Sequence, residues 1–116
     1  MTLILTEFDK IIGGFTPLPW KTGGGEWEED ENGKSFLFNL SSGEKYPLVI
    51  RDKAIWCSRG YGPSFGHPDL EIADKAFYNS NSCANFPNCY NNGNYKNSPG
   101  STQLFCGTKN GHFRIK

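Results

Sequence analysis

Residues 35–40 read SFLFNL, and this stretch decides the fold class because its apolar side chains follow the two-residue period of a β-strand. Phe36, Phe38 and Leu40 fall on one face of the strand, and Leu37 makes the opposite face at least partly apolar. The stretch therefore predicts a strand, and the segments on either side of it continue the pattern.

Short strand-like runs recur along the rest of the chain. Residues 2–15 hold two apolar runs around a turn at 8–10, and YPLVIR (46–51), AIWCS (54–58) and DLEIA (69–73) give three more. TQLFCG (102–107) and HFRIK (112–116) predict two closing strands around an Asn110-Gly111 hairpin turn. Because no stretch has a long amphipathic helical pattern, we expect a mostly β protein with seven or so short strands in a sandwich.

Three segments are predicted to connect these strands. Residues 17–34 form a polar loop with Trp20 and Trp27, in which Gly23-Gly24-Gly25 argues against a regular element. GPSFGHPDLEIAD (62–74) predicts a Gly/Pro corner that leads into a strand, with Phe65 anchored in the core. Residues 78–101, rich in Asn, Ser and Gly, predict a long ordered loop with aromatic anchors at Tyr78, Phe86, Tyr90 and Tyr95.

Length and charge narrow the class of protein. The 116 residues correspond to one domain, and 12 Lys+Arg balance 12 Asp+Glu. A net charge of zero gives no electrostatic reason to bind nucleic acid or an anionic membrane, and no apolar run approaches the roughly 20 residues of a membrane span. MTLILTEFDK (1–10) does not have the pattern of a signal peptide. We therefore expect a cytoplasmic location, with a reducing compartment that favours thiols over disulfides.

The cysteines and histidines do not form a recognisable metal motif. Cys83-x5-Cys89 lacks the tight Cys-x2-Cys spacing of zinc knuckles, and nothing fixes the distance between the two histidines, His67 and His112. Cys57 and Cys106 stand alone in strand-like segments, where we expect small buried hydrophobic residues. The expectation is a chain without a metal or a cofactor.

The sequence also gives little support for a catalytic site. A cysteine nucleophile needs a nearby base and a depressed pKa, and the sequence indicates neither. The acids in 26–31 suit a solvated loop, and Asp69 and Glu71 alternate with Leu70 and Ile72 as on a half-exposed strand rather than as a glycosidase pair. We expect no enzyme, with a thiol-dependent or metal-dependent enzyme left as an alternative.

Glycines and polar aromatics also suggest binding sites. Gly13-Gly14 and Gly23-Gly24-Gly25 lack the Lys-Ser/Thr of a phosphate-binding loop, so Gly13-Gly14 predicts a bulge or a close backbone approach inside a strand. The Asn- and Tyr-rich stretch 78–95 fits a sugar-binding surface in composition only, and the sequence favours an ordered Asn-rich loop instead.

Taken together, five segments resemble the TLDc domain family. They are IIGGFTPLPW (11–20), KSFLFNL (34–40), 54–74 with AIWC and YGPSFGHPDLEIAD, NSNSCANFPNCY (79–90) and QLFCGTKNGHFRIK (103–116). The resemblance implies a sandwich of two antiparallel sheets with short flanking helices and no established catalytic residues. It also implies binding and regulation of the vacuolar-type proton ATPase, and protection from oxidative stress.

The resemblance further implies that 1–116 is a single domain truncated at both ends, because the family's N-terminal helical segment and C-terminal strand are missing. We expect a non-catalytic protein-interaction module with Trp20 and Trp27 on its partner surface, and the alternative for either Trp is that it caps the core. The scaffold residues implied by the family signature are Gly13, Gly14, Phe15, Phe36, Phe38, Gly62, Pro63, Phe65, Gly66 and Asp69. The alternative is a structural component of a large cytoskeletal or ciliary assembly, and the location is then ciliary or organelle-associated.

Overall fold

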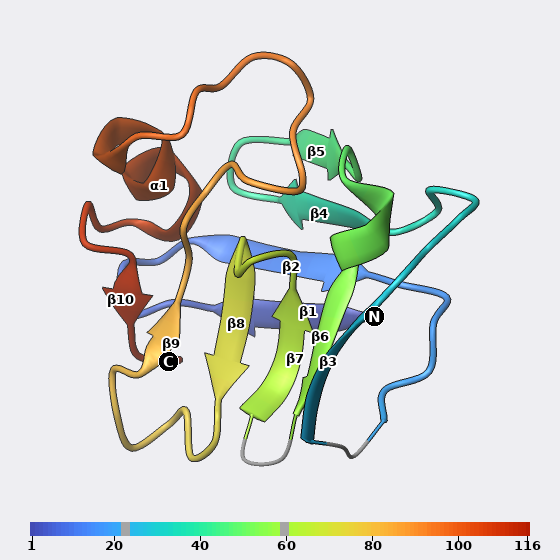
Figure 1. Ribbon diagram of the computed structural model, residues 1–116. Coiled ribbons are helices and arrows are strands. Elements are labelled where there is room, and N and C mark those ends of the chain that lie inside the picture. The colour runs from blue at the N-terminus through green and yellow to red at the C-terminus, as the bar shows by residue number, and fades with distance from the viewer. Residues whose placement is uncertain (22–23, 59–60) are drawn as a thin grey trace.

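In the computed structural model, which describes residues 1–21, 24–58 and 61–116, two antiparallel sheets pack against each other (Figure 1). The first sheet has four strands in the order β1-β2-β4-β5, namely β1 (Thr2–Leu5), β2 (Ile11–Phe15), β4 (Phe36–Asn39) and β5 (Glu44–Pro47). The predicted strand around 35–40 is confirmed as β4.

The second sheet has six strands in the order β10-β9-β8-β7-β6-β3. They are β10 (His112–Phe113), β9 (Ser82–Cys83), β8 (Leu70–Ala73), β7 (Tyr61–Phe65), β6 (Ile55–Ser58) and β3 (Gly24–Glu28). A 3-10 turn, η1 (Arg51–Lys53), precedes β6, and one helix, α1 (Pro99–Cys106), lies beside the sheets. The predicted mostly β, two-sheet architecture is therefore confirmed.

The core lies between the sheets and depends on Gly14. Ile12 and Leu37 point inward and are fully buried, as is Phe65 on the facing sheet. A Cβ added to Gly14 would lie 2.6 Å from Cζ of Phe65 and 2.9 Å from Cδ2 of Leu37. The close backbone approach predicted for Gly13-Gly14 is thus confirmed, and it brings β2 against the Phe65 ring.

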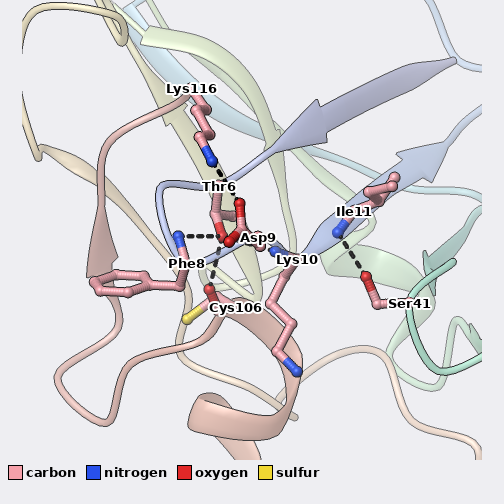
Figure 2. Close-up of polar contacts among 8 residues, drawn as sticks. All are labelled: Thr6, Phe8, Asp9, Lys10, Ile11, Ser41, Cys106 and Lys116. Carbon is pink, nitrogen blue, oxygen red and sulfur yellow. Dashed lines mark hydrogen bonds and ion pairs between the residues drawn. The ribbon is translucent and has the colours of Figure 1, made fainter.

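The turn between β1 and β2 joins the first sheet to the end of α1 (Figure 2). The Thr6 hydroxyl is buried, donates to the carbonyl of Cys106 at 3.2 Å and accepts the N–H groups of Phe8 and Lys10. Beside it, the Lys116 ammonium lies 2.6 Å from the Asp9 carboxylate. These contacts place α1 at one end of the sandwich.

The strand predicted over 102–107 is wrong, because these residues belong to α1 and to the glycine that ends it. Ser98 is the N-cap and its hydroxyl accepts the N–H of Ser101, while Pro99 starts the helix. Gly107 ends it with φ +104°, a value that favours glycine. The Asn110-Gly111 turn consequently joins a helix to β10 instead of two strands, and β10 covers only His112–Phe113 of the predicted 112–116.

Two further boundaries differ from the prediction. The predicted loop 17–34 contains the edge strand β3, which accommodates Gly25 at φ +99° through a register shift between Gly24 and Glu26; Gly23 lies outside the described residues. Gly62 and Pro63 lie in β7, at a register shift between Tyr61 and Ser64, so the corner itself begins at Gly66.

The long segment 78–101 is anchored as predicted at Phe86 and Tyr90, which are buried, and at Tyr95, which packs on the core. Tyr78 is 80% exposed, so its predicted role as an anchor is wrong. The strand predicted over 46–51 is also too long, because β5 ends at Pro47 and Arg51 already begins η1. Pro47 has no N–H to continue the ladder.

Candidate functional site

Trp27 is held in a fixed orientation on the edge strand of the larger sheet. Its ring stacks on His67, with centroids 4.9 Å apart, and meets the ring of Trp56 edge-on at 4.5 Å. The indole N–H donates to the carbonyl of Gly66 at 3.2 Å, and the Lys53 ammonium lies 4.8 Å from the ring centroid. Trp27 nevertheless stays 38% exposed, so a partner can reach an aromatic ring that is already oriented.

Trp20 lies in the connection between β2 and β3 and is 43% exposed. Its ring meets Phe65 edge-on, with centroids 5.5 Å apart. Because Phe65 is almost fully buried, Trp20 rests on the core while it faces solvent. Trp20 therefore covers part of the core and remains available to a partner.

Trp56 separates two hollows on this surface. One, of about 310 Å³, is lined by Trp20, Trp56, Tyr61 and Pro63 among others. The other, of about 170 Å³, is lined by residues that include Trp27, Trp56, His67 and Glu71. We define the Trp surface as Trp20, Trp27, Trp56 and Tyr61.

The corner that supports Trp27 is held by a buried carboxylate. Asp69 accepts the backbone N–H groups of Asn88, Cys89 and Tyr90 at 2.7, 2.8 and 3.0 Å, and more weakly that of His67 at 3.4 Å. Burial raises the pKa of Asp69 to about 6, although these donors act in the opposite direction. Asp69 therefore joins the corner to residues 88–90, which are distant in the sequence.

Gly66 makes this arrangement possible. Its φ is +73°, and a Cβ there would lie 1.9 Å from Oδ1 of Asp69. A side chain at this position would displace the carboxylate from its N–H donors. Gly66 and Asp69 therefore act together to position the turn that carries His67 against Trp27.

The two histidines lie apart on the larger sheet. His67 lies in the corner beside Trp27, near one edge, whereas His112 pairs with Cys83 in the register of β10 and β9 at the other edge. Within the described part of the chain, no group of three or more His, Cys, Asp or Glu side chains could hold a metal ion.

Cys83 is the one described cysteine that is not fully buried, and it faces a carboxylate. Its thiol donates to Glu71 at 3.6 Å, and the register places His112 on its other side. Burial, together with the Glu71 charge, raises the pKa of Cys83 to about 12. The thiol thus stays protonated near neutral pH, which disfavours a nucleophilic role. The sequence alone does not predict that Glu71, Cys83 and His112 lie side by side, because these residues come from three different strands.

The remaining cysteines are buried. Cys57 lies in β6 and Cys106 ends α1, so Cys106 does not lie in the predicted strand. Burial raises the pKa of Cys106, and it raises the pKa of Cys89 to about 11. The expectation that Cys57 and Cys106 are small buried residues is confirmed.

The acidic segment 26–31 is only partly the solvated loop that the sequence predicts. Glu26 and Glu28 lie on β3, and Glu28 pairs with Lys21 at 3.1 Å. Asp30 is buried and accepts both the N–H and the hydroxyl of Ser35. Asp30 therefore shapes the turn between β3 and β4, and the prediction that it is solvated is wrong.

The other signature residues lie mainly in the two sheets. The ring of Phe38 lies against Gly13, and a Cβ added to Gly13 would come within 2.6 Å of Cζ of Phe38. Phe15 and Phe36 stack with centroids 5.4 Å apart, on the side of the sheet that faces away from the core.

No helix of the described residues is long and apolar enough to cross a membrane.

A family model described as the TLDc domain matches residues 1–115. Comparison with curated proteins and with solved structures gave no match. The family match covers nearly the whole sequence and agrees with the resemblance carried by the five segments quoted above. The chain therefore belongs to the TLDc domain family.

Proposed function

We propose that the chain is a non-catalytic protein-interaction domain that docks a partner through Trp20 and Trp27. The observation that carries this proposal is the orientation of Trp27, which His67, Trp56 and the Gly66 carbonyl hold in place while the ring stays exposed. Aromatic rings dominate the energetics of interfaces. A ring that is already ordered also loses less entropy on binding.

The chemistry of the described residues favours binding over catalysis. The thiols of Cys83, Cys89 and Cys106 have raised pKa values, so each is a poor nucleophile at neutral pH. Asp69 is engaged with backbone N–H groups that fix the corner. These groups have structural roles, which supports the reading of the domain as a binding module.

The candidate partner is the vacuolar-type proton ATPase, because that is the partner that the family resemblance implies. In this proposal the domain regulates assembly of the ATPase, and any protection from oxidative stress follows from that interaction rather than from cysteine chemistry. The Trp surface suits such a role because its two hollows can accept side chains of a partner.

The test is affinity capture from cells with the tagged chain and three variants. Trp20→Ala and Trp27→Ala each remove an exposed ring of the Trp surface. Phe77→Ala is the matched control, because Phe77 is 66% exposed and follows β8, away from β3. We expect proton ATPase subunits with the wild type and with Phe77→Ala, and their loss with both Trp variants. Equal recovery with all four proteins would contradict the proposal.

A second candidate function is a structural role in a cytoskeletal or ciliary assembly. The observation that favours it is the number of large apolar side chains that are exposed on the smaller sheet, among them Leu3 and Leu40. Recovery of tubulin-associated proteins instead of ATPase subunits in the same capture experiment would favour this function.

A further inference from the structure

The smaller sheet has apolar side chains on both faces. Its inner face carries Ile4, Ile12 and Leu37 toward the core. Because side chains alternate between the two faces along each strand, the remaining residues of the paired strands point to the outer face of the sheet. We define the outer face by this set, which consists of Leu3, Leu5, Ile11, Phe15, Phe36, Phe38, Leu40, Lys45 and Pro47.

This outer face is accessible and contains a depression. Leu3 and Leu40 are each 58% exposed, whereas Phe38 is 7% exposed. A hollow of about 390 Å³ lies over this part of the sheet, with Leu3, Phe38, Leu40 and Lys45 among its lining residues. Antiparallel sheets commonly place polar side chains on the face that meets water. An exposed patch of this kind therefore indicates an interaction site.

The frame under the outer face is well ordered by hydrogen bonds. Strand pairing is continuous from β1 through β2 and β4 to β5. At the start of β2, the Ile11 N–H donates to the Ser41 hydroxyl at 2.9 Å (Figure 2). The Phe38 ring fills the space above Gly13, which has no side chain. The face is thus a preformed surface.

The area of the outer face fits a single α-helix better than a second folded chain. Three strand spacings of about 4.8 Å and two steps of about 6.7 Å along a strand give a patch of about 14 by 13 Å between Cα atoms. With side chains, this is on the order of 400 Å², about half of what each partner buries in a stable dimer. One α-helix, about 10 Å wide and 20 Å long over about 13 residues, covers the patch.

The charge of the outer face defines the occupant further. Lys45 is the only charged residue in the set, and its ammonium lies 4.1 Å from the centroid of the Phe36 ring. Glu44 also lines the hollow, but its carboxylate is engaged because it accepts the hydroxyls of Tyr46 and Tyr95. Lys45 lies on β5, an edge strand of this sheet, and pairs in register with Phe38, so the positive charge lies at the border of the apolar patch. A carboxylate on the flank of a bound helix would meet Lys45.

We propose that the outer face is a docking site for an amphipathic helix of a partner protein, with its apolar stripe on Leu3, Phe38 and Leu40 and an acidic residue opposite Lys45. This site lies on the opposite sheet from the Trp surface. It does not depend on Trp20 or Trp27, and it adds a second contact to the function proposed above.

The test uses three designed peptides of about 14 residues, a length that spans the patch. The first has leucines at i, i+3, i+4 and i+7 with glutamates on the flanks of the stripe, the second has lysines instead of those glutamates, and the third is a scrambled form of the first. Each is titrated into the isotope-labelled protein, while amide chemical shifts report the location of binding and its dissociation constant.

We expect the glutamate peptide to bind saturably, with shifts in β1, β2, β4 and β5, and to bind tighter than the other two. Leu3→Asp and Leu40→Asp should each weaken it about tenfold or more, because each places a charge under the apolar stripe. Leu104→Asp is the matched control: Leu104 is 59% exposed but lies on α1, and this variant should bind like the wild type.

A charge exchange tests the site without relying on these variants. Lys45→Glu should reverse the preference, so that the lysine peptide binds tighter than the glutamate peptide. Absence of saturable binding by the glutamate peptide, or shifts confined to the larger sheet, would overturn the proposal. So would a wild-type dimer in ultracentrifugation that Leu40→Asp converts to a monomer, because the occupant would then be a second copy of this chain.

Discussion

Replacement of Gly14 by alanine probes the contact on which the packing of the two sheets depends. The added Cβ would lie 2.6 and 2.8 Å from two carbons of the Phe65 ring and 2.9 Å from Cδ2 of Leu37. Ordinary contacts between carbon atoms are about 3.5–4.0 Å, so neighbours must move by about 1 Å. Phe65 cannot move freely, because its ring also contacts Trp20 and Tyr90. We expect a loss of about 2 kcal/mol in the free energy of unfolding.

The assay is urea unfolding followed by tryptophan fluorescence, supported by thermal melting. A loss of this size corresponds to a fall in Tm of roughly 8 °C for a domain of this length. Gly100→Ala is the matched control, because Gly100 lies in α1 and a Cβ added there would meet, among the described residues outside the helix backbone, just the Ser98 hydroxyl oxygen at 3.8 Å. This control should be unchanged or more stable by up to about 1 kcal/mol. A Gly14→Ala protein as stable as the wild type would refute the reasoning about the contact between sheets.

Three other perturbations have defined outcomes. Asp69→Asn leaves a nitrogen in place of one acceptor oxygen and should lower the free energy of unfolding by about 3 kcal/mol through unsatisfied N–H groups; a loss under about 1 kcal/mol in urea titration would contradict this. Burial acts to raise the pKa of Asp30, but hydrogen bonds from Ser35, together with the backbone of Lys34 and Asn32, outweigh it and the pKa is lowered. The stability that this carboxylate contributes is thus present above its unfolded pKa and lost as pH falls through its folded pKa, so the stability difference between wild type and Asp30→Asn should shrink as the pH falls below about 5. A constant difference would argue against this account. The raised pKa of Cys83 predicts alkylation by iodoacetamide at pH 8 at least about a hundredfold slower than that of a free thiol, followed by mass spectrometry; rapid labelling would show a reactive thiolate.

The sequence permitted prediction of the strands that have a simple apolar pattern. Phe36 and Phe38 on one face of the strand, with Leu37 on the other, predicted β4, and Leu70 with Ile72 on one face predicted β8. Helix α1 was missed because Leu104 and Phe105 lie in a short run that also fits a strand. The signals for its ends were nevertheless present, since Ser98 precedes Pro99 and a glycine follows Cys106.

The candidate site could be predicted only in part. Trp20 and Trp27 are exposed, as their polar surroundings predicted, and their role as a partner surface stays a prediction. Their neighbours could not be predicted, because the contact between Trp27 and His67 joins positions 40 residues apart in the sequence. Asp69 was expected on a half-exposed strand, yet it is buried, because residues 88–90 fold over it and supply N–H donors. Contacts between distant residues decide both environments.

The central claim is that this TLDc domain binds a protein partner through its Trp surface. The most direct measurement is the dissociation constant between the purified chain and purified vacuolar-type proton ATPase, by calorimetry or interferometry. We predict saturable binding that Trp20→Ala and Trp27→Ala each weaken about tenfold or more, while Phe77→Ala leaves it unchanged. Circular dichroism confirms that each variant is folded. Folded Trp variants that bind as tightly as the wild type, or a wild-type chain that does not bind, would contradict the claim.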